Sequence, residues 1–233
     1  MTSRRRILPG APLPAVLAAL AVLASVGCSS DDGESSGTAP SAEAADRAAA
    51  EVVPATADEL SALLVTEVPS GLARVADTEV SPPAGEKSVD DVAGYAEDPA
   101  YERAVLQDYG YRYGWERFWG TPGSTVTSVF VDQFDEAPGA EAYAEDLAAD
   151  GADYYAGPLQ HDPPSLPGGC RLLTVEHPDP ETRVTGPAAF AWCAHGVFSV
   201  AVSAVTGVPD GSVEAATDEV AAVVAEQLER LPG

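Results

Sequence analysis

The sequence predicts an α+β domain, in which an antiparallel sheet carries its helices mainly on one face. Three observations predict this class. Apolar and aromatic residues alternate with other residues through 111–134, around a central Gly-Thr-Pro-Gly-Ser turn, which is typical of a β-hairpin. A similar pattern runs through 188–205, with its turn at His195 and Gly196. A segment with helical spacing follows each hairpin, and strands and helices segregated in this way indicate an α+β domain.

The first elements of the domain are expected to be two helices separated by a loop. Thr56 and Glu59 have the spacing of a capping box, and leucines follow at helical spacing, at positions 60, 63 and 64. Asp98, followed by proline, places an N-cap before a second helix that extends to Tyr109. The intervening residues 77–93 are rich in Pro, Gly, Ser and Asp, which predicts a loop.

The remaining elements follow from the same two spacings. Strands are expected over residues 111–119, 126–134, 170–176, 188–194 and 197–205. Helices are expected from Pro138 to Asp150 and Gly151, and from Ser212 to Leu231. The segments 111–150 and 188–229 therefore share the order strand, turn, strand, helix, and the chain is expected to place two β-hairpin–helix repeats in one sheet.

Cys170 and Cys193 are expected to form a disulfide. If strands 170–176 and 188–194 pair antiparallel with these cysteines opposite each other, the turn falls at residues 181–182, inside a predicted loop. The sulfur atoms would then lie on the face opposite the expected core side chains, Leu173, Val175, Phe190 and Trp192. The alternative, two separate buried thiols, does not suit an exported protein.

Export and lipid attachment are indicated by the start of the chain. Arginines at 4–6 precede an Ala-, Leu- and Val-rich run over 13–26, which is too short to span a bilayer, and small residues lead into Cys28. This resembles the lipobox of bacterial lipoproteins, with Ser25 where a leucine is usual. The resemblance implies that the signal peptide 1–27 is removed and that Cys28 carries a diacylglyceryl group, with palmitate, that holds the protein on the outer face of the cell membrane.

An ordinary secretory signal that leaves Cys28 as a free thiol is the alternative. The cysteine count favours lipidation, because three cysteines leave an odd one once Cys170 and Cys193 are paired. After Cys28, residues 28–52 are rich in Ser, Asp, Gly, Glu and Ala, and such a segment is expected to be a disordered tether. Residues 53–233 then form a single extracytoplasmic domain.

Composition excludes one class of partner. The leader contains three of the 12 Lys and Arg residues and none of the 37 Asp and Glu residues, so nine basic residues against 37 acidic ones give the processed chain a formal charge of −28. Such a domain repels phosphate backbones, and a nucleic-acid partner is not expected.

No motif in the sequence indicates catalysis. The chain has no G-x-S-x-G elbow, no H-E-x-x-H, no phosphate-binding glycine loop and no C-x-x-C. The three histidines are scattered, and the acidic residues do not have the spacing of a calcium loop. We therefore expect a non-enzymatic protein without a metal or another cofactor.

Two features of the sequence could serve binding. The first is an aromatic row expected on one face of a strand: Tyr111, Tyr113, Trp115 and Trp119. It either packs in the core or forms one wall of a groove for a lipid, a glycan or a peptide. The second is the small polar face formed by Ser199, Ala201 and Ser203, which is either solvated or open to a ligand.

The chain resembles the small extracytoplasmic lipoproteins of actinobacteria in its Cys28 lipobox, its tether and its single α+β domain with one disulfide. Its folded part is similar in outline to the extracellular sensor domains of actinobacterial Ser/Thr kinases, which have a twisted sheet and a central cleft. The anchor, the tether, the absence of catalytic motifs and the possible aromatic groove together lead us to expect a membrane-anchored, non-catalytic domain that binds or senses a small molecule, lipid or glycan. The alternatives are a structural lipoprotein that binds another envelope protein, and an envelope hydrolase.

Overall fold

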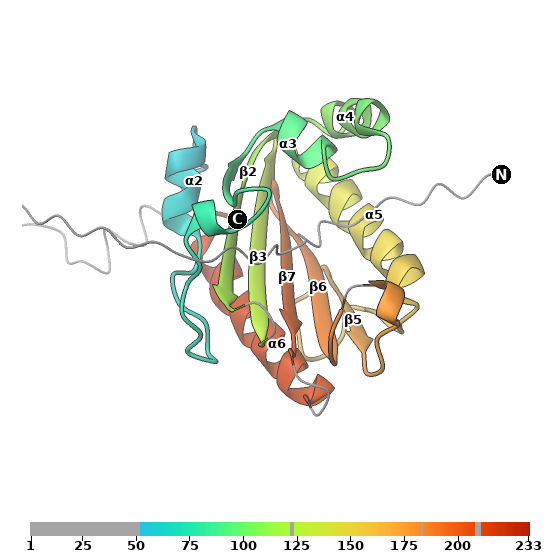
Figure 1. Ribbon diagram of the computed structural model, residues 1–233. Coiled ribbons are helices and arrows are strands. Elements are labelled where there is room, and N and C mark those ends of the chain that lie inside the picture. Colours follow the sequence, from blue (N-terminus) through green and yellow to red (C-terminus); the bar gives the residue numbers. More distant parts are fainter. Residues whose placement is uncertain (1–51, 122–123, 183, 208–210) are drawn as a thin grey trace, which may run out of the picture.

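The computed structural model describes residues 52–121, 124–182, 184–207 and 211–233 (Figure 1). In these residues, antiparallel strands form a seven-stranded sheet in the order β1-β2-β3-β7-β6-β5-β4, which confirms the α+β class with an antiparallel sheet. The strands are β1 (Gly85–Lys87), β2 (Tyr111–Gly120), β3 (Val126–Phe134), β4 (Leu159–His161), β5 (Cys170–Val175), β6 (Ala188–His195) and β7 (Phe198–Val205). The α-helices are α2 (Ala57–Leu63), α3 (Val89–Ala93), α4 (Pro99–Asp108), α5 (Ala137–Tyr155) and α6 (Val213–Arg230).

The two predicted hairpins meet at the centre of the sheet. Strand β3 of the first hairpin pairs antiparallel with β7 of the second, from Val126 opposite Val205 to Gln133 opposite Phe198. Helix α5 follows β3, and α6 follows β7. The chain therefore has the two hairpin–helix segments that its sequence pattern predicts, side by side in one sheet.

The two long helices lie on opposite faces of the sheet (Figure 1). The side chains of Ala189, Ala191 and Cys193 in β6 share a core with Val220 and Val224 of α6. The intervening side chains of β6, Phe190 and Trp192, share a second core with Ala148 and Tyr155 of α5. Helices α2 and α6 lie on one face, whereas α3 and α4 pack with α5 on the other, so the helices are divided between the faces rather than gathered mainly on one. The physical reason is visible in β6, whose continuous apolar run requires cover on both faces.

Local signals placed most helix starts correctly. The Thr56 side chain accepts a hydrogen bond from the Glu59 backbone N–H (3.2 Å), and that of Asp98 accepts one from Tyr101 (3.1 Å). Helix α5, however, continues through the expected stop at Gly151 to Tyr155. Gly151 is buried, and the Tyr155 ring stacks on Phe190 with centroids 4.4 Å apart, so packing against the sheet extends this helix.

The expected loop 77–93 contains short regular elements instead. Strand β1 pairs with β2 at the edge of the sheet, and α3 begins at Ser88 with a capping box completed by Asp91. Three residues of strand are too few for an alternating pattern to predict.

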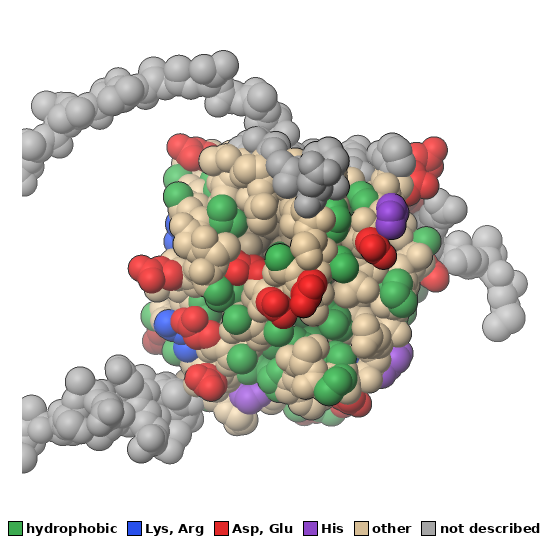
Figure 2. Space-filling view, turned by 90° about the horizontal axis from the view of Figure 1, so that it is seen from below, with side chains coloured by type: hydrophobic (Ala, Val, Ile, Leu, Met, Phe, Trp, Pro, Cys, Tyr) green, Lys and Arg blue, Asp and Glu red, His purple; other side chains and the backbone are tan. Residues whose placement is uncertain are grey.

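Acidic side chains are spread over the surface of the domain. Figure 2 shows them across the face seen from below, where Lys and Arg side chains gather at one side. The whole chain has a formal net charge of −25.

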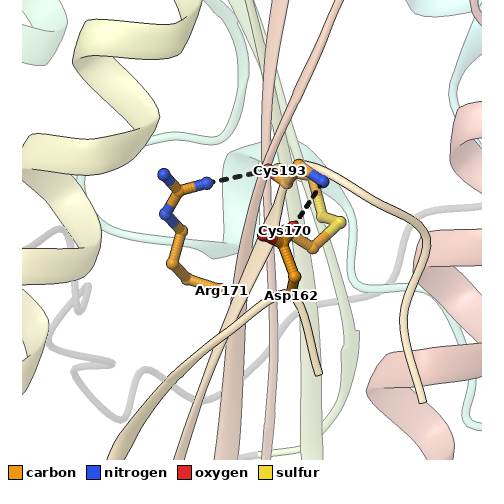
Figure 3. The surroundings of a disulfide bond; sticks show 5 residues. Asp162, Cys170, Arg171 and Cys193 are labelled. Atoms are coloured by element: carbon orange, nitrogen blue, oxygen red, sulfur yellow. Dashed lines mark hydrogen bonds between the residues drawn. A yellow bond between two sulfur atoms is a disulfide. The ribbon is translucent and has the colours of Figure 1, made fainter. Parts of the chain in front are cut away.

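The disulfide forms as the register predicts. Cys170 lies opposite Cys193 in the β5–β6 pair, and their sulfur atoms are bonded. Figure 3 shows the loop beside it, where the Gly169 N–H donates to Asp162 (2.9 Å) and Arg171 donates to the Gly169 carbonyl (3.1 Å). Both cysteines are fully buried in the core beneath α6, which corrects the expectation that the sulfur atoms face away from the core.

Candidate functional site: a buried polar cluster beneath α3

A bulge in β2 divides the predicted aromatic row between the two faces of the sheet. Tyr111 lies opposite Phe134, whereas Tyr113 lies opposite Gln133, so the alternation shifts by one residue between the two tyrosines. Tyr111 therefore belongs to the core between the sheet and α5, where its ring contacts Phe134 edge to face. Trp115 and Trp119 stay on the face of Tyr113.

The three residues on that face contribute to the packing around α2. Trp119 is 1% exposed, and its indole N–H donates to the Thr66 carbonyl at 3.4 Å. Tyr113 and Trp115 are partly buried against the same core, and the Tyr113 hydroxyl donates to the Pro54 carbonyl at 2.8 Å. The four aromatic residues do not form a single wall, and a role in binding stays a prediction for each of them.

A set of charged and phenolic side chains lies on the other face, beside Tyr111, and all of them are buried except Tyr95, which is half-buried. We call it the polar cluster and define it by Lys87, Tyr95, Tyr111, Glu116 and Asp132. Lys87 is the only lysine in the sequence, yet it is 4% exposed. Strand pairing sets Lys87 opposite Gly114 and Gly114 opposite Asp132, so β1, β2 and β3 bring these side chains together.

Glu116 is the centre of the contacts within the polar cluster. Its carboxylate lies 3.2 Å from the Lys87 ammonium, and both side chains are 5% exposed. The Tyr95 hydroxyl donates to the other carboxylate oxygen at 2.9 Å. One acidic side chain of β2 thus holds residues from both ends of the segment 87–95.

Asp132 lies deeper in the polar cluster. The Tyr111 hydroxyl is 3.1 Å from Asp132 Oδ1 and 3.2 Å from the Lys87 carbonyl, so its proton can serve either acceptor. Ser199 lies opposite Asp132 in the β3–β7 pair and is 1% exposed. Its Oγ has no hydrogen-bond partner among the described residues. A buried hydroxyl without a partner is uncommon in folded proteins.

Burial shifts the titration of these groups. It raises the pKa of the Glu116 carboxyl to about 7, although Lys87 and the hydrogen bond from Tyr95 oppose the rise. It also raises the pKa of Asp132 to about 7 against the hydrogen bond from Tyr111. The pKa values of Tyr95 and Tyr111 lie above their usual range, first because of burial and then because of the nearby carboxylates. The arrangement can therefore take up and release a proton near neutral pH.

Sequence reasoning missed the polar cluster, although part of its signal was present. Asp132 alternates with Phe130 and Phe134 along β3, which places a carboxyl on an apolar face. Glu116 occupies the corresponding face of β2, opposite Phe130. The place of Lys87 in the polar cluster could not be predicted from the sequence, because its contact with Glu116 depends on the pairing of the three-residue strand β1 with β2.

The second predicted feature has a mixed environment. Ser199 is buried beside Asp132, whereas Ala201 and Ser203 are half-buried. The Ser203 hydroxyl lies 2.7 Å from that of Ser128 across the β3–β7 pair. In the ranges that the structure describes, no group of three or more His, Cys, Asp and Glu side chains is arranged to hold a metal ion. The helices described in these ranges are too short or too polar to cross a membrane.

Comparison with known proteins gives one likeness to report. No protein-family model matches the sequence, and no curated protein matches it. Among solved structures, the chain is similar to the extracellular domain of PknH from Mycobacterium tuberculosis, with a TM-score of 0.47 and 14% sequence identity. The match covers 76% of this chain and 97% of that one.

Proposed function

We propose that this protein is a lipoprotein on the outer face of the cell membrane, anchored through Cys28, and that residues 53–233 form a non-catalytic domain that binds or senses a ligand outside the cell. The signal peptide 1–27, Cys28 and all of the tether except Val52 lie outside the described residues. The observation that carries the proposal is the pairing of Cys170 with Cys193, which leaves Cys28 as the one cysteine of three for lipid attachment.

The disulfide also supports an extracytoplasmic location. Stable disulfides form in oxidising compartments and are rare in the bacterial cytosol. The Cys170–Cys193 disulfide joins β5 and β6, the second and third strands from one edge of the sheet, and both cysteines are 0% exposed. Such a structural bond fits a domain that works outside the cell.

The proposed boundary between tether and domain agrees with the contacts at the start of the fold. Val52 and Val53 are 68% and 43% exposed, whereas the Pro54 carbonyl accepts hydrogen bonds from Tyr113 (2.8 Å) and from Gln133 (3.0 Å). In the part of the chain that the structure describes, the first of these hydrogen bonds to the sheet is at Pro54, which supports a domain start near residue 53.

For binding, we propose the sheet surface around Phe130, Ala201 and Ser203. These side chains are half-buried on the same face as the polar cluster, and the Phe130 ring contacts Phe118 edge to face at 5.5 Å. Aromatic rings beside small hydroxyl side chains suit a ligand that has both apolar and hydrogen-bonding groups. The region combines the small polar face predicted from β7 with an aromatic residue of β3.

The anchor is tested by expressing the full chain and Cys28→Ser in an actinobacterial host. We expect wild-type protein in the membrane fraction, with an intact mass that equals residues 28–233, less two hydrogens for the disulfide, plus a diacylglyceryl modification. Cys28→Ser should keep the signal peptide or appear without lipid. An unmodified Cys28 in the membrane fraction, or cleavage elsewhere, would refute the anchor.

Binding is tested on the detergent-solubilised lipoprotein by native mass spectrometry, with lipid and glycan extracts of the host as probes. We expect a non-covalent adduct that disappears on denaturation, weakens in Phe130→Ala and persists in Tyr101→Ala, a control at a side chain that is 43% exposed. Trp115→Ala tests the aromatic face separately. An adduct that Phe130→Ala leaves unchanged would move the site elsewhere, and no adduct with any extract would contradict ligand binding.

A further inference from the structure

We propose that the polar cluster is a proton-binding site, and that proton uptake there holds residues 85–95 against the sheet. We call residues 85–95 the cover segment; it comprises β1, α3 and Tyr95. The proposal goes beyond the proposed function, because it requires neither the lipid anchor nor a ligand.

The polar cluster supplies polar side-chain contacts between the cover segment and the sheet, beside the β1–β2 ladder and the apolar packing of α3. Lys87 in β1 and Tyr95 after α3 both contact the Glu116 carboxylate, at 3.2 Å and 2.9 Å. The Tyr111 hydroxyl also lies 3.2 Å from the Lys87 carbonyl. Besides these polar contacts, β1 supplies only three residues to the sheet, and α3 buries Val92 and Ala93. The state of the polar cluster should therefore control how firmly the cover segment is held.

The charges around the site are unbalanced. Each neighbouring element contributes a charged or titratable group: Lys87 from β1, Asp91 from α3, Glu102 from α4, Tyr111 and Glu116 from β2, Asp132 from β3, Tyr143 from α5, and Tyr95 from the cover segment itself. Lys87 is the cation of this set. Within the polar cluster itself, ionised Glu116 and Asp132 place two buried carboxylates beside the one buried ammonium of Lys87, and an uncompensated buried charge is strongly unfavourable.

One proton removes this imbalance. Asp132 is a suitable acceptor, because Lys87 directly contacts Glu116, whereas Asp132 accepts a hydrogen bond from the neutral Tyr111 hydroxyl. Protonation of Asp132 leaves the single negative charge of Glu116 opposite the single positive charge of Lys87.

The direction of the pH dependence follows from the pKa of Asp132, which burial raises from 3.8 to about 7. When the cover segment opens, solvent reaches the carboxyl and its pKa returns toward the ordinary value. The closed state then binds more protons than the open state between about pH 4 and pH 7, so closure is favoured at low pH and lost as pH rises through 7. For one such group, the opening equilibrium should increase about twentyfold from about pH 5.5 to about pH 7.5.

The single lysine allows this equilibrium to be measured directly. Full-length lipoprotein in detergent is pulsed with an amine-acetylating reagent at each pH, and acetylation of Lys87 is read by mass spectrometry of its peptide. Rates are divided by those of the denatured protein at the same pH, which removes the intrinsic reactivity of the amine. We expect the protection of Lys87 to fall about twentyfold over the stated range.

Two matched variants identify the group responsible. Asp132→Asn mimics the protonated form, so it should keep Lys87 better protected than in wild type at about pH 7.5 and remove the part of the pH dependence that Asp132 contributes, while the part contributed by Glu116 remains. Asp135→Asn, at the end of β3 with a side chain that is 69% exposed, should behave as wild type. A pH dependence in Asp132→Asn equal to that of wild type would overturn the assignment. If that variant does not fold, the wild-type profile alone decides, because protection that is flat or rises with pH contradicts the proposal.

Discussion

Gly114 shows how tightly the polar cluster is packed at the scale of a single residue. A Cβ atom at this position would lie 2.1 Å from Asp132 Oδ1 and 2.8 Å from the Tyr111 hydroxyl. The Asp132 carboxylate therefore occupies the space that the side chain of any other amino acid at position 114 would need. The requirement is steric, because the backbone here lies outside the left-handed region.

Gly114→Ala should accordingly destabilise the domain by about 1–3 kcal/mol, the usual range for overpacking a buried site. Urea unfolding followed by tryptophan fluorescence measures the change. Gly168→Ala is the matched control, since a Cβ there meets no atom within 4 Å. Equal urea midpoints for the two variants would mean that Asp132 moves aside without a loss of stability.

Arg117 is a second residue whose role depends on burial. Its guanidinium donates to the carbonyls of Ser61, Leu64 and Val65 at 2.8–2.9 Å, where α2 ends. A cation suits the end of a helix at which carbonyl groups lack partners. Burial lowers the pKa of Arg117 to about 10, which still leaves it charged at neutral pH.

Arg117→Lys should weaken the attachment of α2, because one ammonium cannot reproduce the fork that reaches three carbonyls. We expect a loss of about 2 kcal/mol and faster amide hydrogen exchange over residues 61–66. Arg112→Lys provides the control, since the Arg112 side chain is 42% exposed. Exchange rates in Arg117→Lys that match those of wild type would show that the guanidinium contributes little.

Residue-scale prediction from the sequence succeeded where a local pattern was sufficient. Thr56 and Asp98 could be identified as helix caps, because a cap depends on residues three positions away. Tyr111 was assigned to the wrong face, because a bulge shifts the alternation and leaves no mark in the residue types. The Lys87–Glu116 pair was missed, since it joins residues 29 positions apart through an edge strand.

At the scale of elements, β6 explains why the helices lie on two faces. Its alternate residues are small on the side of α6 and large on the side of α5, with Ala189 and Ala191 against Phe190 and Trp192. Both sets are apolar, so the strand was recognisable from the sequence. The face of the sheet on which each helix packs could not be predicted from the sequence. The sequences of α5 and α6 do not differ in a way that assigns either helix to one face.

The disulfide links two elements and should stabilise both of them. It closes a loop with a sequence separation of 23, for which the chain-entropy model gives about 3 kcal/mol. We expect Cys170→Ala/Cys193→Ala to lose about this much in urea unfolding. Cys28→Ser should leave the midpoint of the folded domain unchanged. A double variant as stable as wild type would show that packing around β5 and β6 suffices.

At the scale of the whole molecule, the acidic surface should work against folding. A formal charge of −25 spread over one chain repels itself, and salt screens this repulsion. From about 0.01 M to about 1 M NaCl the Debye length falls from about 30 Å to about 3 Å. We expect the melting temperature to rise by about 2–4 °C, which corresponds to about 1 kcal/mol in a domain of this size.

The control for this prediction is the same titration near pH 4, where carboxylates begin to be protonated. The salt effect should shrink there because less negative charge remains to be screened. A melting temperature that is independent of salt at neutral pH would mean that the carboxylates are spaced too widely to repel one another.

The two hydrogen bonds to the Pro54 carbonyl determine where a pulling force would enter the fold. A domain held at its N-terminal end receives tension at Val53, and the next carbonyl is bonded to Tyr113 of β2 and Gln133 of β3. The force would therefore act first on β2 and β3, two inner strands, rather than on an edge strand of the sheet. The segment that follows is held in turn by Arg117 and by Gln227 of α6, so extraction of residues 54–68 should precede rupture of the sheet. Stretching from this end should thus give a short first extension, followed by a larger and mechanically separate one.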